Sequence, residues 1–230
     1  MSFSKLKKAS KIGLPACAFA LLYAHDVITT KVTWSREISR LAYARCVSCH
    51  RDGGSAFSLT TYAEARPWAK AIKEEVNERR MPPWGAVKGF GEFRDDQGLT
   101  QEQIELINDW VEGGAPEGDP ARLPKLPDFD RKDPTPKTGT ELVVDGQRTL
   151  RTSLTLEGIR PNGVPEGTSL QVLAELPDGS IEPLLWLYNY KAHFQHAYYY
   201  RKPLVFPAGT KVEITPVSAG TVALLPVVAE

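Results

Sequence analysis

The sequence RCVSCHR at residues 45–51 places two cysteines three positions apart, with a histidine directly after the second. The whole chain has three cysteines and four histidines, so this stretch holds much of its capacity to bind a metal or cofactor. In such a motif each cysteine sulfur can form a thioether with one haem vinyl group, and the histidine can bind the iron. The spacing therefore predicts one covalent haem c, attached at Cys46 and Cys49, with His50 as the proximal iron ligand.

A chance match and a redox disulfide are the two other interpretations of this cysteine pair. A redox dithiol is expected in a βαβ setting. Here the pair follows an apolar stripe of helical spacing formed by Ile38, Leu41 and Ala42. This context favours haem attachment over a redox disulfide.

Met81 is the candidate for the second axial ligand of the iron. It is one of two methionines, the other being the initiator, and it directly precedes Pro82 and Pro83. Methionine and histidine are common axial ligands, and a Met/His pair raises the reduction potential of haem. The alternative is that Met81 fills a gap in the core.

Aromatic side chains near these ligands are candidates for the apolar walls of a haem pocket. Those that we assign to the cofactor site are Trp68 and Trp84, and Phe90 and Phe93 are further candidates. Ordinary core packing is the alternative for all four. Arg66 is a candidate partner for a haem propionate, or simply a surface residue.

The residues that must position this site have the apolar spacing of helices from Trp34 to Pro116. Thr61 with Glu64, and Thr100 with Gln103, have the spacing of capping boxes at helix N-termini. A Pro-rich stretch at 117–138 is typical of an extended linker. The first folded unit is therefore predicted to be an all-α domain at 34–116.

Beyond the linker, the helical period disappears and short strand-like runs alternate with Pro-Asp-Gly and Pro-Ala-Gly turns. About seven such runs are typical of a β-sandwich, which we place at 139–230. The sequence thus predicts an α+β chain in two domains, an all-α domain followed by an all-β sandwich.

The N-terminus has the pattern of an export signal. Four lysines lie within the first eleven residues, and an apolar run follows from Ile12 to Ala24. This run is shorter than the roughly 20 residues of a membrane span, so residues 1–24 are either a cleaved signal peptide or an N-terminal tether. We therefore expect the protein to be exported to the periplasm, where it is either free or anchored through residues 12–24 to the inner membrane. The 28 basic and 28 acidic residues give no basic field for nucleic acid.

Residues 34–120 resemble the bacterial single-haem class I cytochrome c domains. The most specific matches are CVSCHR, YAEARPWAKAI, RMPPW and WVEGGAPEGD. The resemblance implies an all-α fold, thioether bonds at Cys46 and Cys49, and His50 and Met81 as the two axial ligands.

The sandwich region weakly resembles the copper type II, ascorbate-dependent monooxygenases, whose fold is a β-sandwich. The similar stretch is LPDGSIEPLLWLYNYKAHFQHAYYYRKPLVFPAGTKVEI. The copper-binding His-x-His of that family is absent, and only His193 and His196 follow Met81. The resemblance therefore implies the fold but not the oxygenase chemistry.

An iron bound on both faces has no open position for a substrate. The leading hypothesis is therefore a carrier of single electrons without catalytic residues of its own. Its expected partner is a membrane redox complex, such as an oxidase, a quinol-oxidising complex or a photosynthetic reaction centre. The alternatives are a cytochrome-fed oxygenase, and a haem sensor or peroxidase in which Met81 dissociates. The aromatic run around Tyr198 is either strand packing or a docking face.

Overall fold

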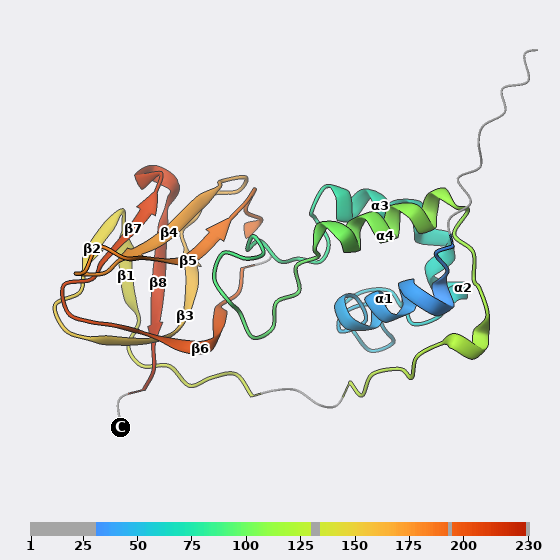
Figure 1. Ribbon diagram of the computed structural model, residues 1–230, viewed down its shortest axis with the longest axis horizontal. Coiled ribbons are helices and arrows are strands. Elements are labelled where there is room, and N and C mark those ends of the chain that lie inside the picture. The colour runs from blue at the N-terminus through green and yellow to red at the C-terminus, as the bar shows by residue number, and fades with distance from the viewer. Residues whose placement is uncertain (1–30, 130–133, 193–194, 229–230) are drawn as a thin grey trace, which may run out of the picture.

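The computed structural model describes residues 31–129, 134–192 and 195–228. The proposed signal or tether at 1–24 and His193 lie outside the described residues. No helix in the described part of the chain is long and apolar enough to cross a membrane. A helical part and a β-sandwich lie side by side, and the chain on either side of residues 130–133 runs extended along one side of the molecule (Figure 1).

The helical part consists of short elements. The α-helices are α1 (Ser39–Arg45), α2 (Tyr62–Ala65), α3 (Ala69–Asn77) and α4 (Gln101–Glu112), with helical turns at Trp34–Ile38, Arg66–Trp68 and Pro120–Arg122. Both capping boxes are confirmed: the side chain of Thr61 accepts from the Glu64 N–H, and that of Thr100 accepts from the Gln103 N–H. The core of this part centres on Trp34 and Trp110, whose ring centroids are 6.0 Å apart.

Within the described residues, eight strands form two four-stranded antiparallel sheets with the orders β1-β8-β3-β6 and β2-β7-β4-β5. The strands are β1 (Leu142–Asp145), β2 (Gln147–Thr149), β3 (Leu154–Asn162), β4 (Leu170–Glu175), β5 (Ile181–Leu187), β6 (Tyr198–Phe206), β7 (Lys211–Thr215) and β8 (Thr221–Pro226). A helical turn at Val217–Ala219 precedes β8.

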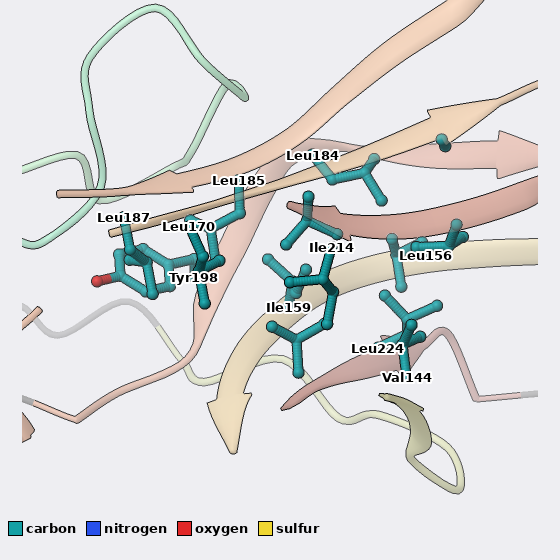
Figure 2. Packing of buried hydrophobic residues seen from close by; sticks show 14 of the residues in the cluster. Val144, Leu156, Ile159, Leu170, Leu184, Leu185, Leu187, Tyr198, Ile214 and Leu224 are labelled. Atoms are coloured by element: carbon teal, nitrogen blue, oxygen red, sulfur yellow. The ribbon is translucent and has the colours of Figure 1, made fainter. Parts of the chain in front are cut away.

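The interior of the sandwich is apolar. Alternate residues of β4 and β7 are buried, as expected for strands with one face toward a core. Leucine and isoleucine side chains from both sheets meet between them (Figure 2). Tyr198 and Tyr200 are each 1% exposed, so these two tyrosines of the aromatic run pack inside the sandwich.

A segment of the helical part, residues 84–94, is built into the sandwich. Ala86 pairs with Leu187 of β5, and Phe93 pairs with Tyr200 of β6. The Val87 N–H donates to the Trp186 carbonyl over 2.8 Å, and the Arg94 N–H donates to the Tyr199 carbonyl over 2.9 Å. This segment therefore contacts one edge strand of each sheet.

The predicted fold class is therefore wrong. The expected all-α class I cytochrome c domain is absent from the described residues: the helices at 34–116 are short, and the two sheets make the molecule mainly β. The physical reason lies after α3, where Pro82, Pro83, Gly85, Gly89 and Gly91 prevent a helix. This stretch instead pairs with the open edges of β5 and β6, whose unpaired backbone groups require partners or cover.

Phe93→Ala tests whether this segment belongs to the sandwich core. The ring is 4% exposed and lies 5.4 Å from the ring of Tyr200, so its loss should lower the free energy of unfolding by about 3–5 kcal/mol. Urea unfolding measures the effect. The control is Val205→Ala, which is 70% exposed on β6 and should change the stability by less than about 0.5 kcal/mol. Equal stabilities of the two variants would contradict the assignment.

Candidate haem-attachment site

The two cysteines and the histidine share one turn of chain at the end of α1. The Cys46 N–H donates to the Ala42 carbonyl over 2.7 Å, and the Cys49 and His50 N–H groups donate to the Cys46 carbonyl over 3.1 and 2.9 Å. Both cysteines are free thiols. The turn therefore holds two thiols and an imidazole close together on a backbone fixed by hydrogen bonds.

The loop after the turn fixes the tautomer of His50. Nδ1 of His50 lies 3.0 Å from the carbonyl oxygen of Phe57. A carbonyl oxygen only accepts, so Nδ1 carries the proton and donates it, and Nε2 keeps its lone pair. Metal-binding histidines have this arrangement, in which one ring nitrogen donates to a carbonyl and the other binds the metal.

The same loop needs a glycine at position 54. A Cβ there would lie 2.2 Å from the Cys49 carbonyl oxygen. The close approach lets the Ala56 N–H donate to the Cys49 carbonyl and the Leu59 N–H donate to the His50 carbonyl, each over 3.1 Å. Gly54 thus allows the tight loop that carries the Phe57 carbonyl to His50.

Burial raises the pKa of the Cys46 thiol to about 12, although the nearby Arg45 charge lowers it and Cys49 raises it further. The thiol is therefore protonated at neutral pH. Redox dithiols act through a thiolate, which needs a lowered pKa. The environment of Cys46 thus weighs against a catalytic redox pair.

Two arginines flank the motif and were not predicted from the sequence. The Nε atoms of Arg45 and Arg51 are both buried without a hydrogen-bond partner. A buried unpaired donor is costly. However, protein atoms cover both Nε atoms, and the adjacent cysteines would hold the vinyl edge of a haem, opposite its propionates. The two arginines therefore do not identify a propionate contact. Arg66, the sequence candidate for this role, is exposed.

An exposed aromatic pair lies beside His50. The ring of Phe57 meets the ring of His50 edge to face at 4.9 Å and lies 4.6 Å from the ring of Trp68. Phe57 is 49% exposed and Trp68 is 47% exposed. A flat apolar group bound here would cover these surfaces. The residues present around the turn thus fit a haem.

Met81 lies on the wall of a cavity of about 480 Å³ between the helical part and the sandwich. Residues that share this wall include Val76, Trp84, Leu99, Ile104, Trp186 and Tyr188. The motif residues Cys46, Cys49 and His50 are not among them. However, Cys46 packs against the apolar cluster to which Val76, Leu99 and Ile104 belong. The structure thus brings the two cysteines and the histidine together. Met81 lines a cavity that shares Val76, Leu99 and Ile104 with the core against which Cys46 packs.

The other aromatic candidates belong largely to the sandwich. Trp84 lines the cavity and stacks on His196, with ring centroids 4.9 Å apart. Phe90 packs against Trp186 at 5.7 Å, and Phe93 lies in the sandwich core. Over the described residues, no group of three or more His, Cys, Asp or Glu side chains is arranged to hold a metal ion.

Comparisons with protein-family models, with curated proteins and with solved structures found no match to this chain. The resemblance of residues 34–120 to single-haem cytochromes c therefore rests on the motifs alone.

The raised pKa of Cys46 predicts slow alkylation in the haem-free protein. A Cys49→Ser variant removes the smaller raising effect of Cys49, but burial should still hold the pKa of the Cys46 thiol well above its ordinary value, so little of it is ionised at pH 9. Iodoacetamide should therefore modify it far more slowly than in urea, where the thiol pKa is ordinary. Peptide mapping by mass spectrometry follows the reaction. Equal rates in buffer and urea at pH 9 would contradict the described environment.

Proposed function

We propose that this protein carries single electrons through one covalent haem c, attached at Cys46 and Cys49 with His50 as the proximal iron ligand. The observation that carries the proposal is the 3.0 Å contact from His50 Nδ1 to the Phe57 carbonyl, in the turn that holds both free thiols. It leaves Nε2 as the nitrogen able to bind iron.

Met81 is the proposed second axial ligand. Its backbone N–H donates to the Glu75 carbonyl at the end of α3 over 3.2 Å, and its side chain lies on an apolar cavity wall. When bound, the haem iron would change between Fe(II) and Fe(III) by losing or gaining one electron. The protein's part is to hold both axial ligands so that little rearrangement accompanies the transfer.

The proposed location is the periplasm, on the basis of the lysines and apolar run in residues 1–24. A membrane redox complex, such as an oxidase, a quinol-oxidising complex or a photosynthetic reaction centre, is the proposed partner. The motifs support a relationship to bacterial single-haem cytochromes c in haem binding, without the all-α fold. The cavity beside Met81 favours one competing function, a haem sensor in which an external ligand replaces Met81.

Replacement of the attachment residues tests the haem assignment. Protein produced in a periplasm that attaches haem c should retain its haem after denaturation and show a c-type reduced-minus-oxidised spectrum. Cys46→Ser and Cys49→Ser should each shift the spectrum toward that of a single thioether, and His50→Ala should lose most of the haem. The matched control is Ser48→Ala, an exposed residue between the cysteines, which should match wild type. Absence of covalent haem from wild type would end the proposal.

Replacement of Met81 tests the carrier function against the sensor. Met81→Ala should remove the weak far-red band of oxidised, Met-ligated haem and lower the reduction potential by on the order of 0.1 V, within the roughly 0.8 V that axial ligands control. It should also let carbon monoxide bind the reduced protein. Gln101→Ala, on the same cavity wall, is the control and should retain the band. Ready binding of carbon monoxide by wild type would favour the sensor.

A further inference from the structure

Trp84 joins the proposed Met81 ligand to the sandwich. Its ring stacks on His196 at 4.9 Å with an interplanar angle of 26°, and meets Tyr198 edge to face at 4.9 Å and Phe93 at 6.0 Å. Tyr198 is 1% exposed and Phe93 is 4% exposed. The indole therefore sits against rings that the sandwich core holds in place.

The chain is also fixed immediately after Trp84. The Gly85 carbonyl accepts from the Tyr188 N–H over 3.2 Å, and a Cβ at Gly85 would lie 3.3 Å from the Tyr198 hydroxyl oxygen. Further along, Arg94 forms an ion pair with the buried Glu157 of β3. The segment thus has contacts with the sandwich at both of its ends.

Little freedom separates Trp84 from Met81. Only Pro82 and Pro83 intervene, and their rings fix the backbone φ angles. The Trp84 N–H donates to the Pro82 carbonyl over 2.7 Å. A shift of the indole would therefore pass directly to Met81.

The other side of Met81 is tied to α3. The Arg80 guanidinium makes two hydrogen bonds of 2.9 Å to the Glu75 carboxylate, and the Met81 N–H reaches the Glu75 carbonyl over 3.2 Å. Met81 is thus held between α3 and the sandwich.

We propose that the β-sandwich positions the second axial ligand of the iron, with Trp84 as the positioning residue that holds Met81 in place. This inference rests on the proposed function, because it assigns the sandwich a role in that same site. If the ring contacts that hold Trp84 are weakened, the population in which Met81 is off the iron should rise. With these contacts intact, the sandwich would help to set the reduction potential and would keep external ligands away from the iron.

His196 and Tyr198 can be replaced without substituting any residue that lines the Met81 cavity. His196→Ala removes the stacked ring, and Tyr198→Leu removes the edge contact. Both variants should keep their covalent haem, weaken the far-red band and lower the reduction potential. A tenfold larger open fraction should raise the apparent affinity of the reduced protein for carbon monoxide about tenfold.

Two further variants separate positioning from general loss of stability. His196→Phe keeps a flat ring over Trp84, so its far-red band should be as strong as that of wild type, in contrast to His196→Ala. Val144→Ala opens the same core at a residue that is 0% exposed and lies at the opposite end of the buried cluster from Tyr198 (Figure 2). This variant should lower the melting temperature while the band and potential match wild type.

The outcomes distinguish the inference from the function on which it rests. Wild type without covalent haem, or without the far-red band, would overturn the proposed ligation and this inference together. The other outcome is that wild type has covalent haem and the far-red band, and that His196→Ala has the same band, reduction potential and carbon monoxide affinity as wild type. This result would overturn the inference alone. If Tyr198→Leu does not fold, His196→Ala carries the test by itself, because Tyr198→Phe would keep the ring that contacts Trp84.

Discussion

The pairing of residues 84–94 with the edges of β5 and β6 is the constraint on which the rest of the structure depends. These strands are the outer members of the two sheets on the same side of the sandwich, and their unpaired backbone groups would otherwise face solvent. The pairing covers each edge near Leu187 and Tyr200, brings Phe93 into the core and joins Arg94 to Glu157. It therefore completes the sandwich and fixes the helical part against it at the same time.

The features that the sequence predicted correctly depend on neighbouring residues. The capping boxes at Thr61 and Thr100 follow from side chains three positions apart. The sandwich strands follow from period-two burial between turn residues, as in β4. The prediction of an all-α first domain was wrong because the partners of residues 84–94 lie about a hundred positions further along the chain, and helical periodicity carries no information about them.

The same distinction applies to the candidate site. The spacing of Cys46, Cys49 and His50 was readable from the sequence because the motif is one turn long. The partner of His50 was not, because it is the backbone carbonyl of Phe57, which any residue at that position could supply. Arg45 and Arg51 adjoin the motif, but only their buried, unpaired Nε atoms distinguish them from surface arginines. No local pattern connects Trp84 with His196 and Tyr198.

The chain passes between its two parts more than once, which limits how this protein can be divided. Residues 84–94 reach the sandwich and the chain then returns to form α4, before the extended segment crosses again (Figure 1). A protease cut in that extended segment would therefore leave two fragments that still share a core. For the same reason, a gene fusion with its junction in this segment would transfer a sandwich lacking Ala86 and Phe93. The two parts have to be inherited and transplanted as one unit.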